Sequence, residues 1–96
     1  MPLVYQSTHL LVIVTHMKDR WKNIDNTLYK KFTFQNFKEA LLFVNKASEI
    51  FEECNHHPDI CIKSYKEVHI TTTTHDAGNT VTEKDYQITK AIDRLL

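Results

Sequence analysis

A long amphipathic stretch, Phe37–Cys54, does most to limit the folds open to this chain. Its apolar side chains recur at intervals of three and four residues, which is the period of a helix face. Asn36 precedes the stretch and Glu39 follows three residues later, a pairing typical of a helix N-terminus. Pro58 disfavours helical backbone just before it, so we expect the helix to end near Asn55.

The apolar positions of this helix form a band wider than one contact with a sheet needs. They lie in two adjacent rows, so one row can cover the sheet of its own chain while the other meets a second subunit. A helix that is simply well buried within its own domain explains the band equally well. One row comprises Phe37, Leu41, Val44 and Phe51, and the other Ala40, Phe43, Ala47, Ile50 and Cys54, with Leu42 beside them.

Alternating polar and apolar residues on either side of this helix predict strands. One strand, Leu28–Phe34, follows a turn at Asp25-Asn26. Ile60–Tyr65 and Val68–Thr74 form a hairpin that turns near Lys66-Glu67. In the last strand the core face carries Val68, Ile70, Thr72 and Thr74, and the opposite face carries His69, Thr71, Thr73 and His75.

Two further helices complete a predicted order of α-β-β-α-β-β-α. A helix is favoured for Ser7–Trp21, although Val12–Val14 would also suit a strand. Another spans Glu83–Leu95, with Thr82 as its N-cap and Asp85 at the third helical position. Because hairpins pair antiparallel, we expect an α+β fold with a four-stranded antiparallel sheet and helices packed on one face.

The composition excludes several classes of function. Twelve basic and twelve acidic side chains leave no net charge, so the usual electrostatic signature of a nucleic-acid binder is missing. With Gly78 as its single glycine, the chain builds neither a Walker loop nor a dinucleotide-binding turn. We expect one domain over residues 1–96, soluble and cytoplasmic, because no apolar run is long enough to span a membrane. Cys54 and Cys61 form no CxxC pair, and we expect both to be buried thiols.

Three of the six histidines occupy the ends of predicted elements. His56 and His57 follow the long helix, and His75 ends a strand. Imidazole titrates at about pH 6.5, so three converging groups would form an acid/base pocket. Two alternatives stay open: these are ordinary surface or capping histidines, or they form a zinc site with Asp76 or Asp85. No HExxH motif or thiolate pair supports the zinc site.

The spacing around these histidines resembles the signature of the pterin-4a-carbinolamine dehydratase family, and the similarity extends from Trp21 to Leu96. Asn79 stands where that family more often has a glycine, and the loop between His75 and Asp85 is one residue longer. Ile60 replaces an aromatic residue. The matching residues are Glu52, His56-His57-Pro58, Tyr65, Val68-His69-Ile70, Thr74-His75-Asp76 and Asp85.

The resemblance implies a hydro-lyase that dehydrates 4a-hydroxytetrahydrobiopterin to quinonoid dihydropterin and so recycles tetrahydrobiopterin, with no metal or redox cofactor. It implies that His56 and His75 are general acids, and that His57 binds the pterin and serves as a base. Glu52 would then orient His56, unless it is an ordinary exposed carboxylate. The other supporting or substrate-binding residues are Pro58, Tyr65, Asp76 and Asp85, of which Tyr65 is alternatively a sheet residue and Asp85 only a helix cap.

The resemblance also implies homodimers that pair into homotetramers through the helix Phe37–Cys54. Some animal members of the family act as dimerisation cofactors of a homeodomain transcription factor through the same helix surface. A second hypothesis is therefore a protein-interaction module whose catalytic residues are relics. Direct nucleic-acid binding and membrane binding are expected in neither case.

Overall fold

The computed structural model of the chain describes residues 20–96, and their elements follow the predicted order. The helix predicted over Ser7–Trp21 lies outside the described residues except for its last two. The strands are β1 (Lys22–Ile24), β2 (Thr27–Thr33), β3 (Asp59–Lys63) and β4 (Glu67–Thr72), and the helices are α2 (Phe37–Cys54), the 3-10 helix η1 (His75–Ala77) and α3 (Glu83–Asp93).

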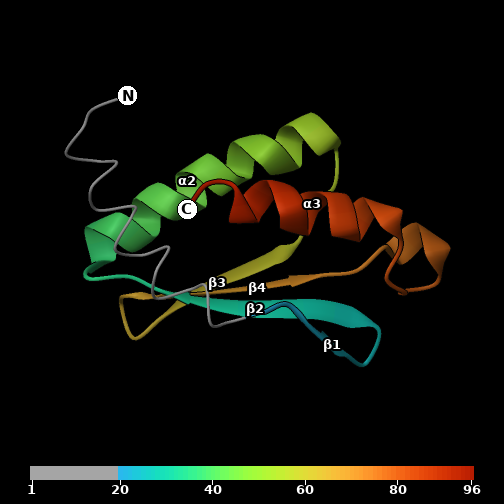
Figure 1. Ribbon diagram of the computed structural model, residues 1–96, viewed down its shortest axis with the longest axis horizontal. Coiled ribbons are helices and arrows are strands. Elements are labelled where there is room, and N and C mark those ends of the chain that lie inside the picture. Colours follow the sequence, from blue (N-terminus) through green and yellow to red (C-terminus); the bar gives the residue numbers. More distant parts are fainter. Residues whose placement is uncertain (1–19) are drawn as a thin grey trace.

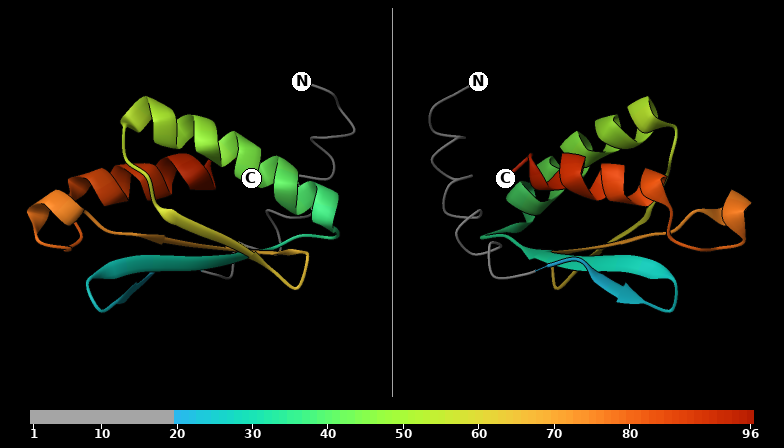
Figure 2. Two further views of the ribbon diagram at one scale, coloured as in Figure 1. Left: turned by 180° about the vertical axis from the view of Figure 1, so that it is seen from behind. Right: turned by 45° about the vertical axis from the view of Figure 1, so that its right-hand side comes forward.

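The strands form one antiparallel sheet in the order β1-β2-β4-β3, with β2 and β4 at its centre. Helices α2 and α3 lie side by side over one face of this sheet (Figure 1). Figure 2 shows the same two-layer arrangement from two further directions. The predicted α+β fold, with its helices on one face, is confirmed for the described residues.

The core lies between the sheet and the two helices α2 and α3, and the strands contribute residues from alternating positions. In β4, Val68, Ile70 and Thr72 are fully buried, as their shared face predicts. The ring of Phe43 on α2 lies 4.8 Å from that of Phe32 on β2, measured between ring centroids. Each such buried side chain contributes roughly 1.5–3 kcal/mol, so this contact holds α2 firmly against the sheet.

Helix α3 is attached to the sheet at its C-terminal end as well as through its buried face. Asp93 accepts hydrogen bonds from Trp21 Nε1 at 3.1 Å and from Lys30 Nζ at 3.0 Å. Lys30 belongs to β2, and its side chain is only 7% exposed. A buried ammonium group needs such a partner, and the pair holds the helix in place over the sheet.

Helix α2 buries only one of its two sides. Phe37, Leu41 and Leu42 are 50%, 41% and 41% exposed, so the prediction that the helix is simply buried in its own domain is wrong for them. Phe51 was assigned to the same row as Leu41 but is buried. The residues of α2 that reach the core are Ala40, Phe43, Ala47 and Phe51.

Two local predictions are corrected by the structure. Cys54 and Cys61 are free thiols, as expected, but both are exposed rather than buried. The β3–β4 hairpin turns over Ser64, Tyr65 and Lys66, so the turn starts two residues before the predicted Lys66-Glu67, and Glu67 already pairs with Lys63. Ser64 and Tyr65 have φ values of 50° and 54°. Ser and Tyr are not typical residues for positive φ, so the residue types at these positions did not predict the turn.

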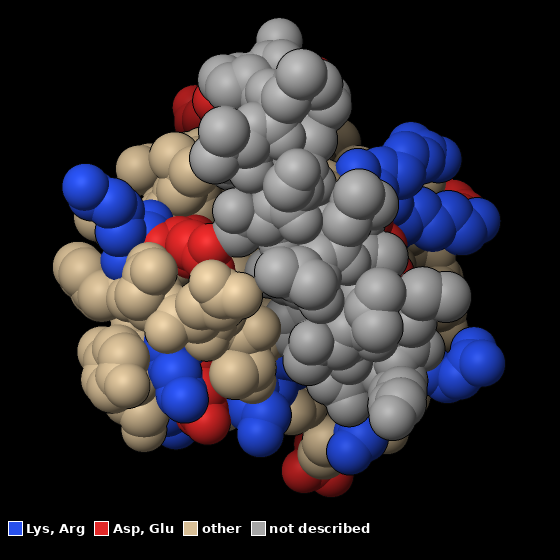
Figure 3. Space-filling view, turned by 60° about the vertical axis from the view of Figure 1, so that its left-hand side comes forward, with Lys and Arg blue, Asp and Glu red and all other residues tan. Residues whose placement is uncertain are grey.

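Charges of both signs are mixed on the surface. On the face drawn in Figure 3, Lys and Arg side chains lie among Asp and Glu side chains, in line with the zero net charge. Among the described residues, no helix combines the length and the hydropathy needed to span a bilayer.

Candidate active site

The end of α2 sends its two adjacent histidines in different directions. Asn55 ends the helix in the left-handed conformation, with φ 51° and ψ 44°, and its N–H donates to the carbonyl of Glu52 at 3.2 Å. Asn tolerates this conformation better than most residues. The reversal turns His56 inward, where its side chain is 12% exposed, whereas His57 is 59% exposed.

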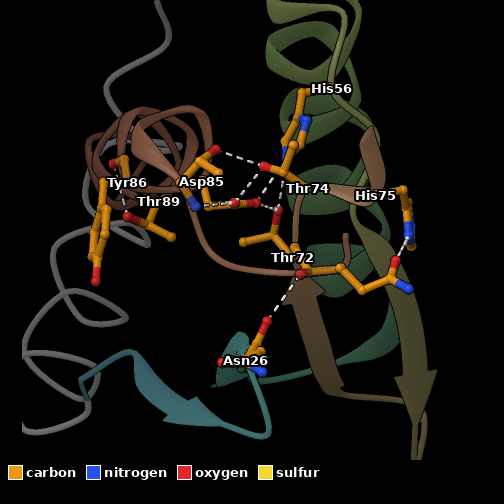
Figure 4. Close-up of polar contacts among 11 residues, drawn as sticks. Asn26, His56, Thr72, Thr74, His75, Asp85, Tyr86 and Thr89 are labelled. Atoms are coloured by element: carbon orange, nitrogen blue, oxygen red, sulfur yellow. Dashed lines mark hydrogen bonds and ion pairs between the residues drawn. The ribbon is translucent and has the colours of Figure 1, made fainter. Parts of the chain in front are cut away.

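The beginning of α3 supplies Asp85, a carboxylate that is fully buried. The N–H of Thr82 donates to its Oδ2 at 2.9 Å, which completes the predicted capping box. Thr74 Oγ1 donates to the same oxygen at 2.7 Å, and Thr72 Oγ1 donates to Oδ1 at 2.6 Å. His56 Nε2 lies 2.8 Å from Oδ1. Figure 4 shows these groups converging on Asp85 from the ends of α2, β4 and α3.

These contacts determine the charge of Asp85. Burial raises the pKa of its carboxyl, but the hydrogen bonds from Thr72, the Thr82 N–H, Thr74 and His56 together outweigh burial and hold the pKa below its ordinary value. The position in the first turn of a helix also favours a negative charge. Asp85 is therefore a carboxylate at neutral pH.

The charge of Asp85 in turn fixes the tautomer of His56. A carboxylate only accepts hydrogen bonds, so the proton in the contact of 2.8 Å must be on His56 Nε2. The second ring nitrogen, Nδ1, then gains a proton when the ring becomes charged and loses it when the ring becomes neutral. The arrangement makes Nδ1 the atom through which His56 exchanges protons.

Glu52 contacts a different histidine from the one expected. Its Oε2 lies 2.7 Å from His57 Nε2, and the two side chains are 76% and 59% exposed. The expectation that Glu52 orients His56 is wrong because it treated the four-residue spacing between them as one helical turn. The left-handed Asn55 breaks that spacing, turning His56 toward the sheet and leaving His57 beside Glu52.

His75 opens η1, directly after Thr74, which lies two residues beyond the end of β4 and binds Asp85. Its Nδ1 lies 2.6 Å from Asn79 Oδ1, and both residues are exposed. The ring of His75 lies apart from Asp85 in Figure 4. Because the amide oxygen accepts, Nδ1 carries a proton and Nε2 is the free nitrogen of the neutral ring. A glycine in place of Asn79 would provide no such partner.

The remaining site residues are divided between the two ends of the β3–β4 hairpin. Pro58, directly after His57, precedes β3, and the exposed Asp76 lies in η1 next to His75. Tyr65 is 61% exposed in the turn at the far end of β3. Within one chain, the structure does not bring Tyr65 to the histidines.

Sequence reasoning missed the hydroxyl groups of Thr72 and Thr74 as members of the site. Both residues were assigned to the core face of the predicted strand Val68–Thr74, and both are buried. A buried hydroxyl requires a hydrogen-bond partner. Two threonines on the same face as Val68 and Ile70 therefore indicated that their hydroxyl groups have hydrogen-bond partners. The pattern did not identify Asp85 as that partner.

The zinc alternative required several ligands to gather in one place. Within residues 20–96, no group of three or more His, Cys, Asp or Glu side chains is placed to hold a metal ion. His56 and His57 differ in both direction and partner, as expected for adjacent residues ahead of a proline.

Comparison with known proteins identifies the family. The family model described as pterin 4 alpha carbinolamine dehydratase matches residues 6–95. A protein of Picosynechococcus sp. with the provisional name pterin-4-alpha-carbinolamine dehydratase is 47% identical over 75 residues, covering 78% of this chain and 79% of the relative. A protein of Sulfurisphaera tokodaii with the same provisional name is 46% identical over 76 residues, covering 79% and 80%. The chain belongs to the pterin 4 alpha carbinolamine dehydratase family.

Two solved structures share the fold. A transcriptional coactivator/pterin dehydratase from Brucella melitensis superposes with a TM-score of 0.70 at 29% identity, over 77% of this chain and 79% of that one. A pterin dehydratase-like protein described as a RuBisCO assembly factor in the alpha-carboxysome has a TM-score of 0.63 at 22% identity, over 80% and 87%. The second likeness concerns the fold alone.

We expect Asp85 to make the folded protein sensitive to acid. The pKa of its carboxyl is lower in the folded state than in the unfolded chain, where about 3.9 applies, so unfolding takes up a proton. The stabilisation is fully present above that value and is lost as the pH falls through the folded pKa. Between about pH 6 and pH 3, the free energy of unfolding should fall more for the wild type than for Asp85→Asn. Urea denaturation followed by circular dichroism measures both.

Asp59→Asn is the matched control, because Asp59 is an exposed carboxylate outside this network. This variant should follow the wild type. Equal pH dependence in the wild type and in Asp85→Asn would show that Asp85 is not held as a carboxylate by its donors.

Proposed function

We propose that this chain dehydrates 4a-hydroxytetrahydrobiopterin, a pterin-4a-carbinolamine, to quinonoid dihydropterin by histidine acid/base catalysis, and so recycles tetrahydrobiopterin. The contact between His56 and the buried Asp85 carries this proposal. It keeps one nitrogen of a largely buried imidazole occupied and leaves the other to transfer a proton. The family to which the chain belongs supports the choice of substrate.

The reaction needs one proton to be given and one to be taken. The lone pair on N5 expels the 4a-hydroxyl, which is a poor leaving group until it is protonated. The C4a–O bond breaks, the N5–C4a bond becomes double, and the hydroxyl leaves as water with the donated proton. N5 gives up its own proton to a base. The substrate supplies the electron pair, so the protein has only to position proton donors and acceptors.

The three histidines divide between the two proton transfers of this reaction. His56 in its charged form donates to the leaving hydroxyl from Nδ1, while its Nε2–H stays hydrogen-bonded to the Asp85 carboxylate. His75 is held at Nδ1 by Asn79, so in its charged form Nε2 carries the proton that it donates in the same step. His57 accepts the proton from N5, and its Nε2 lies 2.7 Å from the Glu52 carboxylate, which orients the ring.

The activity is tested with a chemically generated 4a-hydroxytetrahydropterin. The purified protein should accelerate its loss, followed by ultraviolet absorbance in a stopped-flow instrument. Because one positioned proton transfer contributes about 10²–10⁴-fold, His75→Ala and His56→Ala should each lower kcat by about 10² or more.

His69→Gln is the control for a histidine outside the site, because the ring of His69 contacts Tyr29 and Glu67 instead. It should retain wild-type activity. If the folded wild type leaves the spontaneous rate unchanged, the enzyme proposal is wrong.

We also propose self-association through α2, as a homodimer or homotetramer. The exposed side of this helix carries Phe37, Leu41 and Leu42. Apolar side chains that leave water on association provide the driving force, and a closed symmetric assembly is its usual outcome. A purely interaction-based function would use the same helix face, and the coactivator name of the Brucella melitensis relative supports keeping that alternative. The presence of His56, His57 and His75 together favours the enzyme, since a binding module has no need of three histidines that can exchange protons.

Leu41→Lys should lower the molar mass of the particle in solution, because it places a charge in the apolar side of α2. Light scattering at micromolar concentration measures the mass. Gln87→Lys adds the same charge to an exposed position of α3 and should leave the mass of the wild type unchanged. A monomeric wild type, or an unchanged mass for Leu41→Lys, contradicts association through this face.

A further inference from the structure

Thr72 is a polar residue at a position that the fold treats as core. It is the last residue of β4 and shares a face with Val68 and Ile70, and all three are fully buried. Valine would fill nearly the same volume. A hydroxyl at such a position lowers stability unless it is hydrogen-bonded, so its contacts indicate what it does.

The hydroxyl of Thr72 lies between the two partners of the Asp85–His56 contact. It donates its one hydrogen to Asp85 Oδ1 at 2.6 Å. Its oxygen lies 3.3 Å from His56 Nε2, which itself lies 2.8 Å from the same Oδ1. Because that hydrogen is already used, the oxygen presents a lone pair to the ring. The Nε2 proton of His56 therefore faces two acceptors, the carboxylate and the threonine oxygen.

The neighbouring hydroxyl shows that this arrangement is particular to Thr72. Thr74 also donates to Asp85, but to the other oxygen, Oδ2, and its remaining contact is with Thr82. Among residues 20–96, Thr72 is the one whose hydroxyl contacts both Asp85 and His56. Thr74 and Thr82 fix the carboxylate, whereas Thr72 fixes the carboxylate relative to the ring.

We propose that Thr72 is a positioning residue for the dehydration, which holds His56 with its proton on Nε2 and leaves Nδ1 as the nitrogen that exchanges protons. This inference rests on the proposed function. Thr72 is fully buried and acts through His56 rather than on the substrate. Its loss should therefore impair proton transfer more than binding.

Thr72→Val tests the inference because it removes the hydroxyl and preserves the shape. It should lower kcat by about tenfold or more, the effect of losing one hydrogen bond to a charged group, with KM changed little. Thr72→Ser restores the hydroxyl and should recover most of the activity. In the absence of substrate, ¹⁵N NMR of the His56 ring should show more of the neutral ring protonated on Nδ1 in Thr72→Val than in the wild type.

Thr89→Val is the matched control for removing a buried hydroxyl. Thr89 lies one turn along α3 from Asp85, is 5% exposed and donates to the carbonyl of Tyr86 at 2.9 Å rather than to Asp85 or His56 (Figure 4). This variant should keep the kcat and the ring tautomer of the wild type. Any general cost of losing a hydroxyl from the core would appear in both valine variants.

The possible failures are distinguishable. If the folded wild type has no dehydratase activity, the proposed function is wrong, and the NMR comparison still decides whether Thr72 positions the ring. If the wild type is active and Thr72→Val matches it in kcat and tautomer, Thr72 is only a core residue. If Thr72→Val does not fold, the wild-type spectrum decides, because a neutral His56 ring protonated mainly on Nδ1 contradicts the assignment.

Discussion

The buried carboxylate of Asp85 is the interaction on which the rest of the site depends. A charge at a fully buried position is strongly unfavourable unless donors surround it. Here the donors come from three separate places in the chain: the end of α2 through His56, the strand β4 and its extension through Thr72 and Thr74, and the start of α3 through Thr82. The carboxylate therefore binds together the elements of the fold and gives His56 a fixed orientation.

This interaction joins stability to function. Because Asp85 also caps α3, the same carboxylate organises a helix terminus and sets the protonation pattern of a histidine. The other site residues are exposed and form two pairs, His57 with Glu52 and His75 with Asn79. These side chains are open to solvent, while the buried network keeps His56 in place. The division matches a site in which one proton donor is preorganised and the others are accessible.

Local patterns predicted much of the fold, and contacts between distant segments account for what they missed. The helix Phe37–Cys54 and the buried face of β4 follow from periodicity and capping, which depend on near neighbours. The partner of Glu52 was predicted wrongly because it depends on the backbone at Asn55, where the helix ends. The contacts of Thr72 could not be read from the sequence, since they require β4, α2 and α3 to be packed together. The family resemblance drew attention to the histidines, and their roles in catalysis are a proposal.

The most direct test of this account is the titration of the Asp85 side-chain carboxyl, followed by ¹³C NMR in the folded wild type. The account predicts that its pKa lies below the value of about 3.9 for a free Asp side chain, because the surrounding donors outweigh burial. It also predicts that the chemical shift of the His56 ring changes in the same titration step, since the two groups share a hydrogen bond. A pKa at or above that of a free Asp side chain would contradict the account, because the carboxylate would then not be the anchor of the site.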